Sequence, residues 1–162
     1  MNKNKLLFIR YLSWGLTALI MIILFNLSAQ TRAQSSSLSG SITKEVIKFF
    51  YKDIDSLPKE ELASIMSAIH VFIRKAAHFT AYFFIGVFSL TAMHTYSCKR
   101  KIKVAVCLAV GLAYAVFDEI HQAFIPGRGP GVFDVALDFF GCASGASVVL
   151  LIIFYYERRK KL

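Results

Sequence analysis

Residues 132–156 read VFDVALDFFGCASGASVVLLIIFYY, and this stretch decides the fold. It is long enough to cross a bilayer as a helix, which takes about 20 predominantly apolar residues. It lacks the alternation of apolar and polar residues that a barrel strand needs, so a helix is the structure that satisfies its backbone in lipid. Two carboxylates, Asp134 and Asp138, lie in its first third. The stretch therefore predicts a transmembrane helix with a polar site near one end.

Three further apolar stretches precede this one. They predict transmembrane helices at about 6–27, 79–96 and 102–120, beside the one at 132–156. The composition agrees, because 56% of the 162 residues are hydrophobic and 18% are charged, whereas a soluble domain has about 25% charged residues. This composition excludes disorder and argues against a water-soluble monomer. We predict an all-α fold, an integral membrane bundle of four transmembrane helices that forms a single domain over 1–162.

The first apolar stretch has a second interpretation. Lys3, Lys5 and Arg10 before an apolar core also resemble a secretory signal, with Ala29 at a cleavage position. The apolar run is long for such a signal, and Leu27 is a poor small residue two positions before Ala29. We expect a retained helix, with cleavage as the alternative.

The basic residues indicate the orientation of the bundle. Much of the net charge of +9 falls in three clusters, at the two termini and between the second and third stretches. The clusters are Lys3, Lys5 and Arg10; Lys99, Arg100, Lys101 and Lys103; and Arg158, Arg159, Lys160 and Lys161. The positive-inside rule then places both termini in the cytoplasm. The charge is explained by this topology, and we expect no nucleic-acid binding.

Residues 28–78 form the sizeable extramembrane piece of this topology. After a serine-rich start, apolar residues recur at helical spacing, and Ser56 and Pro58 are typical of the start of a second helix. We predict an extracytoplasmic amphipathic helical insert on the membrane surface. A small soluble cap over the bundle is the alternative.

Ionisable residues in membrane segments are costly, so each is a functional hypothesis. Here they gather near the outer ends of the last three helices. They are Arg74, Lys75, His78 and Tyr82; Asp118, Glu119, His121 and Gln122; and Asp134 and Asp138. Arg128 lies on a glycine-flanked turn between the last two helices, where it would face these carboxylates. Gly141 and Gly145 form a GxxxG pair that would let a neighbouring helix approach beneath them.

These residues form blocks that resemble the VanZ-like family of bacterial membrane proteins. The blocks are Arg74-Lys75-x-x-His78-Phe79-x-x-Tyr82, Asp118-Glu119-x-x-Gln122-x-Phe124-x-Pro126-Gly127-Arg128, and Asp134-x-x-x-Asp138-x-x-Gly141-x-x-x-Gly145. The similarity covers roughly 28–145. It implies a multi-pass protein of the bacterial plasma membrane, and the family's founding member is linked to low-level resistance to the glycopeptide teicoplanin. The resemblance supplies no reaction, and whether the site is catalytic stays open at this point.

From the residues we predict binding or modification of an anionic cell-envelope lipid or glycan precursor at the outer leaflet. The expected partner is a membrane lipid or a lipid-linked cell-wall precursor. The substrate-binding candidates are Arg74, Lys75, Tyr82, Gln122, Arg128, Asp134 and Asp138. The catalytic candidates are His78 as proton carrier, with Asp118 or Glu119 as base or orienting group. We expect Arg128 to pair with Asp138, directly or through Asp134.

Two alternatives belong to other classes. An ion- or proton-coupled transporter or a metal site would use His78, His121, Asp118, Glu119 and Asp134 as donors. Two nearby arginines would repel a divalent cation, and Cys98, Cys107 and Cys142 lack the spacing of a thiolate site, so we predict no metal and no cofactor. The third hypothesis is a non-catalytic envelope scaffold, whose protein partners the sequence does not identify.

Overall fold

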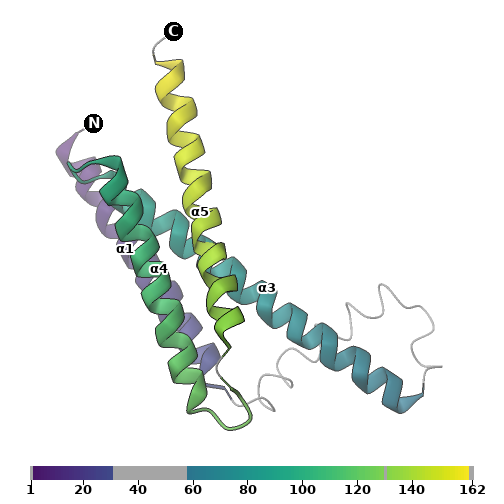
Figure 1. Ribbon diagram of the computed structural model, residues 1–162. Coiled ribbons are helices and arrows are strands. Elements are labelled where there is room, and N and C mark those ends of the chain that lie inside the picture. Colours follow the sequence, from purple (N-terminus) through teal and green to yellow (C-terminus); the bar gives the residue numbers. More distant parts are fainter. Residues whose placement is uncertain (1, 31–57, 130, 161–162) are drawn as a thin grey trace.

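The structure is a computed structural model that describes residues 2–30, 58–129 and 131–160 (Figure 1). It contains the helices α1 (Lys3–Ser28), α3 (Lys59–His94), α4 (Arg100–Ala123) and α5 (Val132–Arg159). Each of them is long and apolar enough to cross a membrane, and the described residues contain no strand. The predicted all-α membrane bundle is confirmed.

The second membrane helix is longer than the sequence predicts. α3 has 36 residues and begins at Lys59, so the predicted surface helix and the membrane helix are one continuous element. The predicted start is correct, with Pro58 before the first turn and acidic residues within it. The helix continues because neither proline nor glycine interrupts it before Gly86. The membrane helix predicted at 79–96 is therefore the second half of a longer helix, and the part of the predicted insert at 31–57 lies outside the described residues.

Both ends of the chain lie at one end of the bundle, and the α4–α5 turn lies at the other (Figure 1). Two contacts hold the first of these ends together. Arg10 of α1 donates a hydrogen bond of 2.9 Å to the carbonyl of Thr95, which follows α3. Arg100 at the start of α4 bonds both carboxylate oxygens of Glu157 near the end of α5. The basic clusters thus share one end of the bundle, as the positive-inside argument requires of them.

Close packing of α3 against α5 depends on glycine. A Cβ atom at Gly141 would lie 2.6 Å from the carbonyl oxygen of Phe79, and one at Gly145 would collide with the carbonyl of Phe83. Gly86 on α3 faces the α5 backbone in the same way. The close approach predicted from the GxxxG pair is confirmed. This contact fixes the height at which the polar residues of α3 and α5 meet.

The outer faces of the helices remain apolar. Large side chains such as Ile22, Phe117, Phe140 and Leu151 are exposed on α1, α4 and α5. Exposed apolar surface of this extent is typical of a protein that meets lipid.

Candidate functional site

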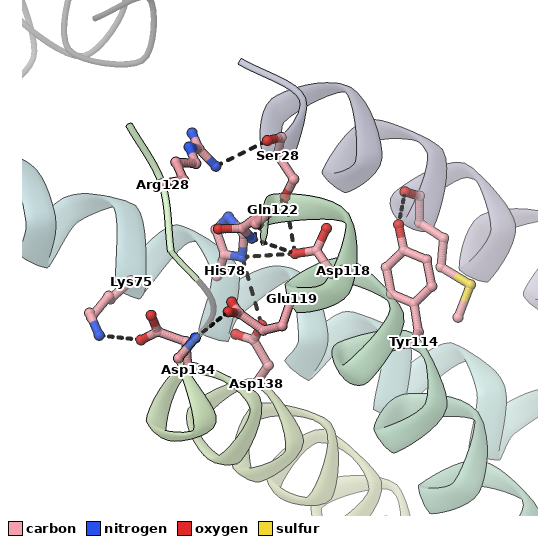
Figure 2. A network of polar contacts seen from close by, with 12 residues as sticks. Ser28, Lys75, His78, Tyr114, Asp118, Glu119, Gln122, Arg128, Asp134 and Asp138 are labelled. Carbon is pink, nitrogen blue, oxygen red and sulfur yellow. Dashed lines mark hydrogen bonds and ion pairs between the residues drawn. The ribbon is translucent and has the colours of Figure 1, made fainter. Parts of the chain in front are cut away.

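The polar residues gather near the α4–α5 turn, at the end of the bundle opposite the start of α1 and the end of α5 (Figure 1 and Figure 2). The end of α1, the middle of α3, the end of α4, the following turn and the start of α5 all contribute. The labelled side chains include Ser28, Lys75, His78, Asp118, Glu119, Gln122, Arg128, Asp134 and Asp138. Apart from Ser28, they are residues that the spacing argument expected at one level, although several of their partners differ from those expected.

His78 lies between two buried carboxylates. Its Nδ1 atom is 3.8 Å from Oδ2 of Asp118 and 3.7 Å from Oδ2 of Asp138. These distances are too long for direct hydrogen bonds but short enough for ion pairing. Asp118 is 0% exposed and Asp138 is 2% exposed. A buried charge is costly unless it is paired, and one imidazole can balance the charge of one carboxylate at most.

Asp118 has further partners from α1 and α4. Its Oδ2 atom accepts a hydrogen bond of 3.0 Å from the Ser28 hydroxyl and another of 3.0 Å from the Gln122 amide. Its second oxygen, Oδ1, is buried and has no hydrogen-bond partner within the described residues. Asp118 on α4 therefore contacts residues of α1 and α3, and its Oδ1 atom remains available as an acceptor.

Arg128 does not contact the carboxylate expected for it. Its Nη1 atom donates a hydrogen bond of 3.2 Å to the backbone carbonyl of Ser28. No carboxylate of the described residues lies within ion-pairing distance of its guanidinium. The predicted pair with Asp138, direct or through Asp134, is wrong. The unpaired carbonyls at the end of α1 attract the guanidinium, while Asp138 lies deeper and faces His78.

The Arg128 guanidinium is under electrostatic stress. Burial lowers its pKa from the usual value, and the positive charge of nearby Arg74 lowers it further. Its Nε atom is buried and finds no partner in the part of the chain that the structure describes. An anion bound beside these two arginines would offset the lowering of the Arg128 pKa and would accept a hydrogen bond from its Nε atom.

Lys75 contacts Asp134, the carboxylate that was expected to link Arg128 to Asp138. Its ammonium group forms an ion pair with Asp134 in the first turn of α5. Glu119, at the end of α4, accepts a hydrogen bond of 2.7 Å from the backbone N–H of Gly131. These two contacts position the start of α5 against α3 and α4.

The residues enclose a small polar cavity. Its volume is about 10 Å³, room for one water molecule or one ion. Its walls are Arg74, Lys75, His78, Glu119, Gln122, Asp134, Leu137 and Asp138. We call this space the polar cavity.

A second and larger space adjoins it. A groove of about 520 Å³ runs between α1 and α3, and its walls are almost entirely apolar. Ile20 to Leu27 of α1 line one side, and Ala76 to Phe84 of α3 line the other. His78 belongs to the walls of both spaces. We call the second space the apolar groove.

Four predicted residues are not among the walls of the polar cavity, namely Tyr82, Asp118, His121 and Arg128. The ring of His121 stacks on Phe25 of α1 at 4.4 Å, and His121 is not among the cavity walls. Tyr82, one turn further along α3 than His78, is 0% exposed. Its hydroxyl has no hydrogen-bond partner among the residues described.

Two contributors escaped the sequence argument. Ser28 joins Asp118, Gln122 and Arg128 through its hydroxyl and its carbonyl. The hydroxyl of Tyr114, one turn before Asp118, donates to the carbonyl of Met21. A serine at the end of an apolar stretch carried only a weak signal, because its role depends on how α1 packs against α4.

A family model described as VanZ/LLP1 matches residues 13–155, most of the chain. The chain belongs to the VanZ-like family. The match spans every block on which the resemblance rested, from Arg74 to Gly145. Neither the comparison with curated proteins nor the comparison with solved structures finds a match. The chain is thus a membrane protein of the VanZ-like type, and its chemistry must be argued from the site itself.

Proposed function

We propose that this VanZ-like protein binds an anionic lipid of the cell envelope in the outer leaflet of the bacterial plasma membrane. The head group would lie at the mouth of the polar cavity, against Arg74, Lys75 and Arg128. The hydrocarbon chain would lie in the apolar groove. The carrying observation is that His78 is a wall of both spaces, so one amphiphilic molecule can occupy both sides at once.

The charges at the mouth favour an anion. Arg74 and Lys75 line the polar cavity, and the lowered pKa of Arg128 reflects burial and the neighbouring charge of Arg74. Arg128 lacks an ion-pair partner within the described residues. A guanidinium can bind a phosphate or carboxylate through two parallel hydrogen bonds. An anionic head group would therefore find a charged donor whose acceptor within the described residues is a neutral carbonyl.

The apolar groove favours a lipid over a free glycan. Its volume of about 520 Å³ lies within the range of sites for small ligands. Its walls offer aliphatic and aromatic carbon with few polar groups, which suits a hydrocarbon chain and not a sugar. A lipid-linked cell-wall precursor combines both features, and such a ligand would connect this site to glycopeptide resistance.

The positive-inside rule supports the side of the membrane. All three basic clusters are found at the end of the bundle that holds the termini. With those clusters in the cytoplasm, the polar cavity opens toward the outer leaflet.

A matched pair of ligands tests this proposal. Binding of a long-chain polyprenyl phosphate and of the uncharged polyprenol is measured on purified protein in nanodiscs. We expect the phosphate to bind at least about tenfold more tightly, which corresponds to about 1.4 kcal/mol. Arg128→Ala should remove most of that preference. Arg100→Ala, an exposed arginine at the opposite end, should keep it. Equal affinity for the two ligands, or an unchanged preference in Arg128→Ala, would overturn the proposal.

A further inference from the structure

We propose that His78, Asp118 and Asp138 form a binding site for one divalent transition-metal ion such as Zn²⁺ or Mn²⁺. Each residue offers one ligand atom, and the three atoms lie within 4.8 Å of one another. They come from α3, α4 and α5, so the ion would bind where these three helices meet. Two of its ligands, His78 and Asp138, also line the polar cavity, whereas the lipid proposal assigns the contacts with the anionic head group to Arg74, Lys75 and Arg128.

The first argument is charge. Asp118 and Asp138 are both buried, and no Lys or Arg nitrogen of the described residues lies within 4.0 Å of either carboxylate. A protonated His78 would leave one negative charge unbalanced. A divalent cation would balance both carboxylates while His78 stays neutral, which is the form in which imidazole binds metals.

The second argument is geometry. The Nδ1 atom of His78 lies 3.7 Å and 3.8 Å from the two carboxylate oxygens. Donors around a tetrahedral Zn²⁺ at about 2.1 Å stand about 3.4 Å apart. These two distances therefore need to close by only a few tenths of an ångström. The adjoining polar cavity, at about 10 Å³, has room for an ion or a single bound water.

The third argument is an orphaned polar group. Tyr82 is 0% exposed, and its hydroxyl finds no hydrogen-bond partner in the described part of the chain. It lies one turn from His78 on the same face of α3, and it interacts electrostatically with Asp138 and Asp118. A buried hydroxyl normally has a partner. A metal-bound water at this site would provide one, and it would complete the coordination.

Neither of the two arginines expected to repel a metal, Arg74 and Arg128, lies within 4.0 Å of the ligand carboxylates. Arg128 donates to the carbonyl of Ser28, and Lys75 is paired with Asp134. The ligand set also differs from the one that the sequence suggested. Glu119 is bound to the N–H of Gly131, and His121 stacks on Phe25. The set of one nitrogen and two oxygen donors suits Zn²⁺ or Mn²⁺.

The test uses the full-length protein purified in detergent. It is stripped with a chelator, dialysed and titrated with Zn²⁺ and with Mn²⁺, and bound metal is measured by mass spectrometry and calorimetry. We expect one ion per chain and a higher melting temperature when it is bound. Asp138→Asn should weaken binding at least about tenfold, and His78→Ala should abolish it. Glu61→Gln and His94→Ala, a carboxylate and an imidazole at the two ends of α3 and outside the cluster, should bind as the wild type does.

An absorption spectrum of the wild-type protein with Co²⁺ tests the site even if a variant does not fold. Co²⁺ added to the stripped protein should give an absorption spectrum of nitrogen and oxygen donors, and equimolar Zn²⁺ should displace it. Absence of stoichiometric binding by the wild type would overturn the metal site. Binding that survives unchanged in folded Asp138→Asn or His78→Ala protein would overturn it equally. Neither result bears on the preference for polyprenyl phosphate, so the two proposals fail separately.

Discussion

Oδ2 of Asp138 on α5 lies 3.7 Å from Nδ1 of His78 on α3. The two residues meet because glycine lets the two helices touch one turn further along α5, where Gly141 packs on the carbonyl of Phe79. The partner of Asp138 is thus the imidazole of His78 and not the guanidinium of Arg128. This pairing separates the deep part of the site from the cations at its mouth.

The pairing predicts which mutations are coupled. His78→Ala should destabilise the protein by about 3–5 kcal/mol, because it leaves the buried Asp138 carboxylate without its partner. Adding Asp138→Asn should recover part of this loss. Arg128→Ala and Asp138→Asn should instead be additive, since the two side chains do not contact each other. Free energies of unfolding, measured in detergent micelles for the single and double variants, test both pairs. If Asp138 were coupled to Arg128 and not to His78, the result would contradict the structure.

The Lys75–Asp134 ion pair predicts opposite effects on anion binding. Lys75→Ala should weaken binding of a polyprenyl phosphate several-fold, because a cation is lost from the cavity wall. Asp134→Asn should strengthen binding several-fold, because it frees the ammonium group and removes a negative charge. Titrations at low and high salt check this, and both effects should shrink as screening increases. If both substitutions changed the affinity for polyprenyl phosphate in the same direction, Lys75 would not have this role.

The glycine contact predicts a local sensitivity to size. Gly145→Ala places a methyl group against the carbonyl of Phe83, and such overpacking costs about 1–3 kcal/mol. Gly15→Ala is the matched control on α1, because nothing lies within 4 Å of the added Cβ. Melting temperatures of the two variants should differ clearly. A Gly145→Ala protein as stable as Gly15→Ala would mean that α3 and α5 do not approach this closely.

The proposed orientation predicts which thiols react from outside the cell. Cys98, in the turn before α4, should react with an impermeant reagent in inverted vesicles but not in intact cells. Gly129→Cys in a Cys98→Ala background should show the reverse pattern. Position 129 is exposed and has open space around it, whereas Cys107 and Cys142 are buried. Labelling of Cys98 in intact cells would place the site on the cytoplasmic side.

The level of the site and most of its side chains, though not Ser28, could be predicted from the sequence, because helical spacing and apolar length are properties of single segments. Arg74, His78 and Asp138 fall at fixed distances along apolar stretches. The full length of α3 was not predicted, because its first half, after Lys59, carries charged residues and therefore does not look like part of a membrane-spanning stretch. An uninterrupted helix nevertheless runs through them.

The partners within the site could not be predicted, because they depend on how helices rotate against one another. Asp134 has Lys75 as its partner, whereas Arg128 reaches a backbone carbonyl of Ser28 that no sequence pattern marks. The spacing put His121 beside Asp118, yet its ring stacks on Phe25 of another helix. Each of these contacts joins two elements distant in the sequence.

Photo-crosslinking in native membranes tests the proposed lipid binding most directly. A photoreactive amino acid is placed at Ala77 in the apolar groove, and at Leu151 on the exposed face of α5 as a control. The attached lipids are then identified by mass spectrometry. The account predicts that adducts at position 77 are enriched in anionic lipids relative to position 151, and that Arg128→Ala removes this enrichment. The same lipid profile at both positions would contradict it.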